Sequence, residues 1–478
     1  MTRAKIICTL GPASQDEITI RGLIEAGMNI ARINFSHGAP EELAGIIVKV
    51  RKVAAEKGIP IAILGDLAGP KIRVGDVAGG SVFLEAGKEL TITTRTVMGS
   101  ASLVSTTYPN LVSDVEKGDR ILIDDGNLEL KVLEVSPEEV KTVVVIGGDL
   151  KPHKGMNLPG VKVSAPSIST KDFSDMEFAV KNGLDFLGLS FVRTPDDVFK
   201  AKKLLSNLGS DMPVIAKIER QEAVNAFDAI LENADGVMVA RGDLGVEMPS
   251  EEVPLIQKKI IEKCNIAGKP VITATQMLES MTYNPRPTRA ETSDVANAII
   301  DGSDAVMLSG ETAVGKYPIK AVETMRRIID DVEKEETYRG TSLLGKGRCI
   351  LDPREQESTI QGAVTIAACR AAEILNATAI VAYTQSGSTA RHLSKHRPKT
   401  SIVAITPSET IRRRLALYWG IHTVLVQEVV DTDSMVGVAE SAAKNCGYAR
   451  AGDIIVITSG TPIGVSGSTN LMNIHHIQ

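Results

Sequence analysis

Three charged side chains, Lys217, Glu219 and Asp243, have the types and spacing needed to handle a metal ion and a phosphoryl group. Lys217 and Glu219 alternate in the segment AKIERQE, so on a strand both point to one side. Asp243, in ARGDLG, comes after the next apolar run along the chain. Two carboxylates are too few for a full calcium site, but they suit Mg²⁺ (or Mn²⁺), which takes further ligands from water and substrate. A purely structural ion network is the simpler alternative.

Other polar residues stand at the ends of similar apolar runs. Arg32 offers a planar fork that matches phosphoryl oxygens, and Arg73 offers a second one. Gly242 lets a ligand approach the backbone, and the Thr275 hydroxyl suits a carboxylate or a water. The full set of run ends comprises Arg32, Asn34, Ser36, His37, Asp66, Ser190, Lys217, Glu219, Arg241, Gly242, Asp243, Thr275, Gln276, Ser309 and Glu311. A polar strand cap explains any one of them, but not all of them together.

The elements that must position these residues form a repeating pattern. Short β-branched runs alternate with amphipathic helical stretches, which is typical of parallel strands joined by crossover helices. We expect eight strands, at residues 5–10, 29–35, 60–66, 186–191, 213–219, 236–243, 270–277 and 305–310. Eight such units predict a closed (β/α)8 barrel, whose active site lies at the carboxyl ends of its strands.

The length of 478 residues predicts more than one domain. After Asp66 the expected helix is replaced by segments that alternate apolar with polar residues, which predicts an inserted small β-barrel domain of antiparallel strands. An open α/β domain follows a linker after the last barrel helix, and the single tryptophan, Trp419, is expected to pack inside it. The predicted boundaries are 1–68 and 167–340 for the barrel, 69–166 for the insertion and 341–478 for the C-terminal domain.

Composition excludes several classes of protein. A formal net charge of -6 and an aromatic content of 3% argue against nucleic acid as a partner. No stretch approaches the roughly 18 apolar residues of a membrane span. The five cysteines are widely spaced, without a CxxC pair, and the N-terminus lacks a secretion signal, so a cytoplasmic location is expected.

In the C-terminal domain, a hydroxyl-rich loop follows one predicted strand and opens a helix. Free N–H groups at a helix N-terminus bind phosphate well, although a plain helix cap accounts for the loop almost as well. The residues concerned are Thr384, Ser386, Gly387, Ser388 and Thr389.

In their order along the chain, the motifs CTLGPAS, MNIARINFSHG, GDLAGPKIR, KGMNLPG, AKIERQE, VMVARGDLGVE and NPRPTRAETSDVANAIIDG resemble those of the pyruvate kinase family. The resemblance spans residues 4 to about 336. It implies the transfer of a phosphoryl group from phosphoenolpyruvate to ADP, giving pyruvate and ATP in the last step of glycolysis. It also implies a barrel, an inserted β domain that acts as a lid, and a C-terminal domain.

The resemblance assigns roles residue by residue. Glu219 and Asp243 would hold Mg²⁺, and Lys217 and Arg32 would face the transferring group. Gly242, Asp243 and Thr275 would bind phosphoenolpyruvate. The enolate would be protonated by Lys217 or by a water ordered by Thr275 and Ser309. The nucleotide would be bound by Asn34, Ser36, His37, Arg73 and Lys154.

One position departs from the pattern of many family members, which use K⁺. The ligands of that ion would correspond to Asn34, Ser36, Asp66 and the backbone of Leu67. This chain has Lys71 where those members have a glutamate. Its ammonium group could occupy the place of the ion, so we expect that catalysis does not need K⁺.

The resemblance also implies a homotetramer, and a phosphorylated effector such as a sugar phosphate or AMP at residues 384–389. Two other functions remain open at this stage. A barrel lyase or aldolase acting on pyruvate or phosphoenolpyruvate would also place Mg²⁺ on strand-end carboxylates. A sensor of phosphorylated metabolites would keep the fold without turnover.

Overall fold

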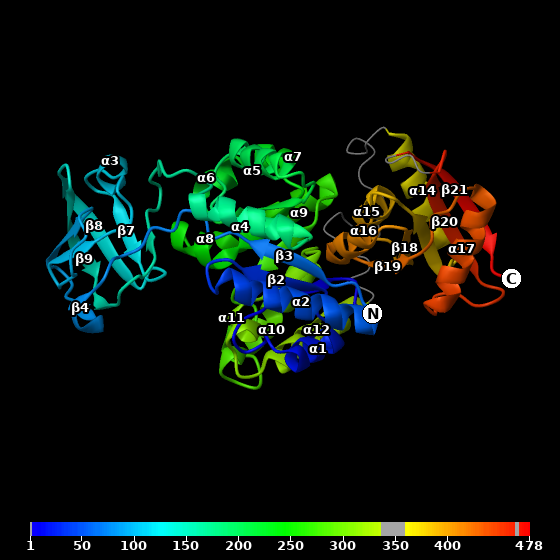
Figure 1. Cartoon of the computed structure of the whole chain (residues 1–478), viewed down its shortest axis with the longest axis horizontal. Coiled ribbons are helices and arrows are strands. Elements are labelled where there is room, and N and C mark those ends of the chain that lie inside the picture. The colour runs from blue at the N-terminus through cyan, green and yellow to red at the C-terminus, as the bar shows by residue number, and fades with distance from the viewer. Residues whose placement is uncertain (1, 336–358, 464–467) are drawn as a thin grey trace.

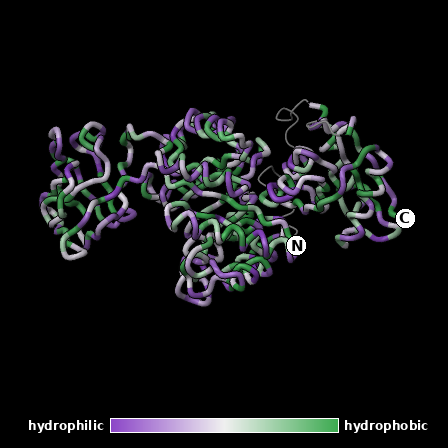
Figure 2. Tube along the Cα trace, in the orientation of Figure 1, coloured by the Kyte–Doolittle hydropathy of each residue, from purple (hydrophilic) through white to green (hydrophobic). Residues whose placement is uncertain are grey.

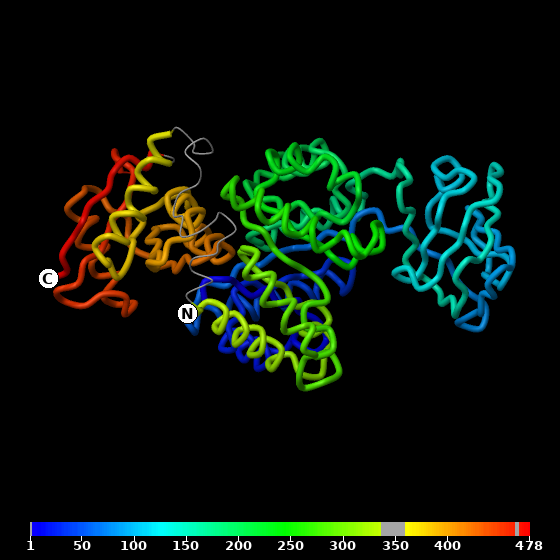
Figure 3. Tube along the Cα trace, turned by 180° about the vertical axis from the view of Figure 1, so that it is seen from behind, coloured from blue at the N-terminus to red at the C-terminus, as the bar shows by residue number. Residues whose placement is uncertain are grey.

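The computed structural model describes residues 2–335, 359–463 and 468–478. The protein is elongated, with an inserted lid domain at one end, a barrel in the middle and a C-terminal domain at the other end (Figure 1). The view from behind shows the same order (Figure 3). The linker predicted after the last barrel helix, with the domain boundary at residues 340/341, lies outside the described residues.

The eight predicted barrel strands are confirmed. They close a parallel barrel in the order β1-β16-β15-β14-β13-β12-β3-β2. Their bounds are β1 (Lys5–Thr9), β2 (Ile30–Asn34), β3 (Ala62–Asp66), β12 (Phe186–Leu189), β13 (Val214–Ile218), β14 (Gly236–Ala240), β15 (Val271–Ala274) and β16 (Ala305–Leu308). Several runs were predicted too long at their carboxyl ends: those at 186–191, 270–277 and 305–310 end as strands at Leu189, Ala274 and Leu308. The run at 236–243 stops being a strand at Ala240, and residues 241–243 open a helix.

Helices surround the barrel strands, and local signals fix where they begin. Capping boxes at Ser169 and Thr288 start α4 and α10, and a proline in the first turn starts α2, α5, α9 and α12. The helices are α1 (Glu17–Ala26), α2 (Pro40–Lys57), α4 (Thr170–Lys181), α5 (Pro195–Asn207), α6 (Gln221–Asn225), α7 (Phe227–Asn233), α8 (Arg241–Glu247), α9 (Val253–Ala267), α10 (Arg289–Ile300), α11 (Gly310–Ala313) and α12 (Pro318–Lys334), with a 3-10 turn at Glu279–Thr282.

The insertion after β3 is made of strands, as predicted. A six-stranded sheet has the order β11-β7-β8-β9-β5-β6, and β10 pairs with β4. The pair β5–β6 is parallel, so the expectation of antiparallel pairing throughout is wrong. The elements are β4 (Val82–Leu84), β5 (Glu89–Thr93), β6 (Leu103–Ser105), α3 (Leu111–Asp114), β7 (Arg120–Ile123), β8 (Leu128–Val135), β9 (Glu139–Ile146), β10 (Gly148–Leu150) and β11 (Met156–Asn157), with a 3-10 turn at Ala78–Gly80.

The C-terminal domain is an open sheet of order β19-β18-β17-β20-β21, in which only β21 is antiparallel. Hydrophobic stretches, green in Figure 2, run through this sheet and through the barrel. The elements are α14 (Ile360–Ile374), β17 (Ala379–Tyr383), α15 (Ser388–Lys395), β18 (Ser401–Thr406), α16 (Glu409–Arg414), β19 (Ile421–Leu425), α17 (Thr432–Asn445), β20 (Ile454–Gly460) and β21 (Thr469–His476), with a 3-10 turn at Leu415–Leu417.

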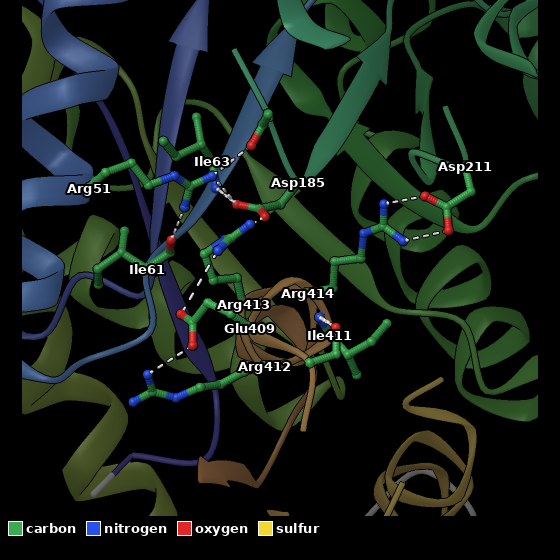
Figure 4. Close-up of polar contacts among 12 residues, drawn as sticks. Arg51, Ile61, Ile63, Asp185, Asp211, Glu409, Ile411, Arg412, Arg413 and Arg414 are labelled. Carbon is green, nitrogen blue, oxygen red and sulfur yellow. Dashed lines mark hydrogen bonds and ion pairs between the residues drawn. The ribbon is translucent and has the colours of Figure 1, made fainter. Parts of the chain in front are cut away.

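Ion pairs fasten the C-terminal domain to the amino ends of the barrel strands. Asp185 lies directly before β12 and is fully buried. Its carboxylate accepts hydrogen bonds at 2.8 Å from Arg51 of α2 and from Arg413 of α16, as Figure 4 shows. The next residue, Arg414, forms a two-point contact with Asp211. The lid therefore sits at one end of the barrel and the C-terminal domain at the other.

Trp419 also lies at this junction. Its side chain is 3% exposed and belongs to the hydrophobic cluster of the barrel. Two guanidinium groups stack on its ring, Arg397 at 4.9 Å and Arg3 at 5.2 Å from the centroid. The expectation that Trp419 packs within the C-terminal domain is therefore wrong, because the ring crosses over to the barrel.

Candidate active site

The strongest sequence candidates meet at the carboxyl ends of β13 and β14, which are neighbours in the barrel. Lys217 is the penultimate residue of β13 and Glu219 directly follows that strand, so both side chains face the barrel mouth. Asp243 reaches the same place from the first turn of α8, directly after β14. The β-strand end thus supplies one carboxylate and the helix start supplies the other.

One hydrogen bond and two ion pairs hold Lys217 in place. Its Nζ lies 2.7 Å from Ser190 Oγ, 2.9 Å from Glu219 Oε1 and 3.1 Å from Asp66 Oδ1. Burial alone would lower the pKa of Lys217, but the charges of Asp66 and Glu219 outweigh that effect and raise it. The side chain therefore presents a fixed positive charge, which can neutralise a moving phosphoryl group.

Asp66 is the counter-charge of two cations. Its side chain is 1% exposed, and Arg32 bonds its Oδ2 at 2.7 Å while Lys217 approaches Oδ1. Burial would raise the pKa of Asp66, yet Lys217 and Arg32 together lower it. Arg32 also donates to Thr9 Oγ1 at 2.9 Å. The arrangement fixes both cationic groups at the barrel mouth.

Glu219 and Asp243 fit a divalent cation. Burial, and then the negative charge of Glu219, raise the pKa of Asp243 to about 7. A cation placed between the two carboxylates would relieve their mutual repulsion. Glu219 Oε2 accepts from the backbone N–H of Phe191 at 2.7 Å, which orients the group. In the described part of the chain, no cluster of three or more Asp, Glu, His or Cys converges on one point. Any metal here would need substrate or water oxygens as further ligands.

Thr275 is held in a strained backbone conformation beside Gly242. Its φ is +66°, in the left-handed region that β-branched residues avoid. Its Oγ1 accepts from the Gly242 N–H at 2.9 Å, and its carbonyl accepts from Arg241 at 2.7 Å. A side chain at position 242 would put its Cβ 3.3 Å from that hydroxyl. The strained conformation thus places the Thr275 hydroxyl directly beside a stretch of backbone that has no side chain.

Ser309 lies at the end of β16 with its backbone N–H bonded to Glu311 at 2.7 Å. Its hydroxyl is buried and has no hydrogen-bond partner among the described residues. Glu311 is fully buried, and burial raises its pKa. The Ser309 hydroxyl is therefore available to bond a water or a substrate oxygen.

Of the five residues expected on the nucleotide side, Arg73 and Lys154 lie between the barrel and the lid, whereas Asn34, Ser36 and His37 are not among the residues that line this space. Arg73, Lys154 and Asp243 line a cavity of about 250 Å³. Arg73 donates to the carbonyl of His153 at 2.8 Å, and Lys154 pairs with Asp124 at 2.6 Å. The His37 residue is exposed, but partial burial of its ring, and then the charges of Lys71, Arg73 and Arg32, lower its pKa.

Lys71 reaches one of the expected monovalent-ion ligands. Its Nζ bonds Ser36 Oγ at 3.1 Å, and the Ser36 N–H in turn donates to Asn34 Oδ1 at 3.0 Å. Burial of the ammonium end and repulsion from Lys217 lower the pKa of Lys71. The ammonium group therefore already contacts the oxygen that an ion would use.

Sequence reasoning missed four residues that line the same cavity. Asp124 and Asp125 come from a lid turn in which both have positive φ, at 56° and 55°. Arg220 and Glu247 come from the barrel side and are each 6% exposed. The sequence Asp124-Asp125-Gly126 predicts no more than a turn, and Arg220 adds no signal of its own beside Glu219.

In the C-terminal domain the hydroxyl-rich loop opens α15, as expected. Gly387 precedes the helix with φ +82°, and its N–H is bonded to Thr384 Oγ1 at 2.9 Å. Ser388 and Thr389 already have partners, Gln361 and Thr469. The structure thus brings the five residues together without assigning a ligand to them.

Comparison with known proteins supplies the context for this geometry. Residues 1–322 match the family model for the pyruvate kinase barrel domain, and residues 362–475 match the model for the pyruvate kinase alpha/beta domain. A pyruvate kinase of Geobacillus stearothermophilus is 49% identical over 480 residues, covering 99% of this chain and 80% of the relative. A pyruvate kinase of Staphylococcus aureus strain MRSA252 is 47% identical over 477 residues, with the same coverage.

The fold has a matching solved structure. The crystal structure of a pyruvate kinase from Cryptosporidium parvum superposes with a TM-score of 0.91 at 37% identity. The match covers 100% of this chain and 96% of that one. The likeness therefore includes the barrel, the insertion and the C-terminal domain.

Proposed function

The chain belongs to the pyruvate kinase family, and from this premise we propose how its own residues transfer a phosphoryl group from phosphoenolpyruvate to ADP. The protein is an enzyme, a phosphotransferase whose products are pyruvate and ATP. The observation that carries the proposal is the placement of Lys217 between Asp66 and Glu219, with Asp243 beside them.

The family depends on a divalent metal, which we propose is Mg²⁺ (or Mn²⁺) held by Glu219 and Asp243. When bound, the cation neutralises charge on the transferring group and orients its oxygens. Lys217 and Arg32 present fixed positive charge to that group, because Asp66 holds both in place. Phosphoryl transfer needs mainly positioning and neutralisation, so no protein nucleophile is required.

The substrate's carboxylate end is proposed to lie against Gly242, Asp243 and Thr275, where the strained Thr275 hydroxyl and a side-chain-free backbone are exposed to it. Transfer leaves an enolate, which must gain a proton at carbon. We assign this step to a water ordered by Thr275 and Ser309. The Ser309 hydroxyl, which has no hydrogen-bond partner among the described residues, supports this choice over Lys217, because the charges of Asp66 and Glu219 raise the pKa of Lys217 and make it a weaker acid.

The nucleotide is proposed to bind in the cavity between lid and barrel. Arg73 and Lys154 would meet its phosphates, and Asn34, Ser36 and His37 complete that side. Closure of the lid would exclude water during transfer, since water would compete with ADP for the phosphoryl group. The position of Lys154 on the lid supports this role.

The monovalent ion of many family members, at Asn34, Ser36, Asp66 and Leu67, is proposed to be replaced here by Lys71. The contact between Lys71 Nζ and Ser36 Oγ supports this, because an ammonium and K⁺ carry the same charge. Activity in tetramethylammonium buffer should therefore equal that in K⁺. A loss of more than about tenfold without K⁺ would refute the replacement.

Three further features of the protein are proposals as well. A phosphorylated effector, such as a sugar phosphate or AMP, is proposed at Thr384, Ser386, Gly387, Ser388 and Thr389. Ser386→Asp should abolish any activation by AMP or glucose 6-phosphate and leave basal activity unchanged. We also propose a homotetramer, testable by light scattering. The domain boundaries after residues 68, 166 and 340 are kept as proposals.

A cytoplasmic location is proposed as well. Cys8, Cys264 and Cys446 are free thiols, which fits a reducing compartment. None of the described helices is long and apolar enough to cross a membrane. Alkylation of intact cells, comparing a membrane-permeant with an impermeant thiol reagent, checks this, since only the permeant reagent should label Cys446.

One assay separates the proposed function from its rivals. The protein is incubated with phosphoenolpyruvate, ADP and Mg²⁺, and pyruvate and ATP are measured together. Equal amounts of both are expected. Pyruvate without ATP would favour a lyase-like or hydrolytic chemistry, and neither product would favour a sensor.

A further inference from the structure

Two chain segments join the lid to the barrel. The outgoing segment follows β3, and the returning segment runs from β11 to about residue 165. Close to the lid the two segments pair with each other, through an isolated bridge between Arg73 and Gly155 and a hydrogen bond from Met156 N to Ile72 O. They form a two-stranded stalk. The orientation of the lid therefore depends on how the returning segment is fixed to the barrel.

Two arginines at the ends of neighbouring barrel strands bind the carbonyl groups of the returning segment. Arg193, after β12, donates to Ala165 O at 2.8 Å and also to Val163 O. Arg220, after β13, donates to Val161 O at 3.2 Å and to Leu158 O at 3.5 Å. Both guanidinium groups thus bind the backbone, and not the side chains, of the returning segment.

Arg220 shares its charge with two carboxylates: Glu222, whose Oε2 lies 3.3 Å from Arg220 Nε, and Glu247, at the C-terminal end of α8. Arg220 and Glu247 are each 6% exposed, and Arg220 Nη2 lies 3.6 Å from Glu247 Oε2. The other carboxylate oxygen, Oε1, accepts from the lid residue Asn157 at 3.4 Å. Oε2 has no hydrogen-bond partner among the described residues. Arg220 and Glu247 therefore each contact the returning segment, Arg220 through backbone carbonyl groups and Glu247 through the side chain of Asn157.

The two contacts of Glu247, with Arg220 at 3.6 Å and with Asn157 at 3.4 Å, are longer than the usual 2.7 to 3.2 Å range of N–H···O bonds. A buried carboxylate oxygen without a donor is unfavourable, so a small shift of the returning segment that brings Arg220 onto Oε2 would be stabilising. The position seen here is thus not the tightest that the pair allows.

Arg220 and Glu247 are close in sequence to the two proposed metal-binding carboxylates, and they share a cavity with Lys154 of the lid. Arg220 is the residue after Glu219, and Glu247 ends the helix whose first turn holds Asp243. On the lid side, Asn157 follows Lys154 by three residues, and Arg220, Glu247 and Lys154 line one cavity. A shift of the returning segment on the barrel would therefore move Lys154 relative to Glu219 and Asp243.

We propose that Arg220 and Glu247 are positioning residues, which seat the returning segment of the lid and so place Lys154 against the nucleotide. The inference rests on the proposed function of the lid. Neither residue is assigned contact with phosphoenolpyruvate or metal. Weakening the pair should therefore affect ADP and not phosphoenolpyruvate.

The test uses the variants Arg220→Gln, Glu247→Gln and the double variant in the full-length protein. As a matched control, Arg120→Gln removes an exposed lid arginine that pairs with Glu129 at 2.8 Å, outside the cavity. Three quantities are measured: the KM for ADP, the dissociation constant of phosphoenolpyruvate with Mg²⁺ in the absence of ADP, and the ratio of pyruvate to ATP. Thermal unfolding, followed by Trp419 fluorescence, verifies that each variant is folded.

We expect either single substitution to raise the KM for ADP about tenfold, which corresponds to roughly 1.4 kcal/mol. The dissociation constant of phosphoenolpyruvate should stay within about twofold. Pyruvate should exceed ATP, because a poorly seated lid admits water. Since the two residues act as one unit, the double variant should be no worse than the more affected single variant.

Parallel losses of ADP and phosphoenolpyruvate affinity would overturn the proposal, since they would show an effect through Glu219 and the metal. Unchanged kinetics, additive effects, or an equal effect of Arg120→Gln would overturn it too. Failure of the proposed function itself is distinguishable, because the unaltered protein would then make no ATP.

Discussion

Replacing Asp66 with asparagine isolates the group that holds two catalytic cations in place. The substitution keeps the shape of the side chain but removes its charge. Asp66 is 1% exposed and pairs with Arg32 at 2.7 Å and with Lys217 at 3.1 Å. The amide oxygen can still accept from one cation, whereas the amide NH₂ repels the other.

Breaking one partner of a buried ion pair costs about 3 to 5 kcal/mol, and the retained acceptor recovers part of it. A loss of about 2 to 3 kcal/mol in the transition state corresponds to a decrease of roughly 30- to 150-fold in kcat. The assay is ATP formation at saturating phosphoenolpyruvate, ADP and Mg²⁺, both with and without K⁺. The control, Asp228→Asn, alters an exposed ion pair with Lys263 on the outside of the barrel.

The same loss is expected in both buffers, because the role of Asp66 is to hold Arg32 and Lys217. A kcat within about threefold of the unaltered enzyme would refute this reasoning. A loss confined to the K⁺ buffer would refute it as well, since Asp66 would then act as an ion ligand.

Four further outcomes follow from the contacts described above. Lys217→Met should lower kcat by about a thousandfold or more while Mn²⁺ binding, measured by electron paramagnetic resonance, persists, because the lost charge acts on the moving phosphoryl group. Lys71→Glu should make activity depend on K⁺, as a titration of the rate with KCl would show. Arg413→Ala should lower the free energy of unfolding by about 1.5 to 3 kcal/mol, measured by urea denaturation, since Asp185 loses one charged donor but keeps Arg51. Burial lowers the pKa of His422 to about 3 in the folded protein, whereas the pKa in the unfolded chain is about 6.5. The contribution of the neutral, buried His422 to the free energy of unfolding is therefore fully present above about pH 6.5 and is lost as the pH falls toward 3. Stability should drop by about 1 to 2 kcal/mol between pH 7 and pH 5 from this residue, and His422→Gln should flatten that dependence in thermal unfolding scans.

The barrel could be predicted from the sequence because its strands are short, mostly apolar runs that are largely buried on both faces. The run at 236–243 shows the limit of that signal. Apolar composition could not tell that Arg241, Gly242 and Asp243 leave the strand and open a helix, because the break depends on the contacts of Arg241 with the backbone at 274–276. The parallel strand β6 was missed because its three residues are too few for a period to be visible.

The metal and phosphoryl residues could be predicted because strand alternation fixes where Lys217 and Glu219 point. The role of Asp66 as a counter-charge could not, since its partner Lys217 is 151 residues away. Asp124, Asp125, Arg220 and Glu247 were out of reach for a similar reason. They meet only through the folded position of the lid, and position along the chain carries no information about that.

The central claim is that Glu219 and Asp243 hold the divalent cation beside Lys217. Crystals grown with Mn²⁺ and phosphoenolpyruvate, without ADP, test it through the anomalous scattering of manganese. The account predicts one strong peak about 2.0 to 2.2 Å from an oxygen of each carboxylate, with a substrate oxygen completing the contact. A peak held instead by the lid residues Asp124 and Asp125, with none between Glu219 and Asp243, would contradict it.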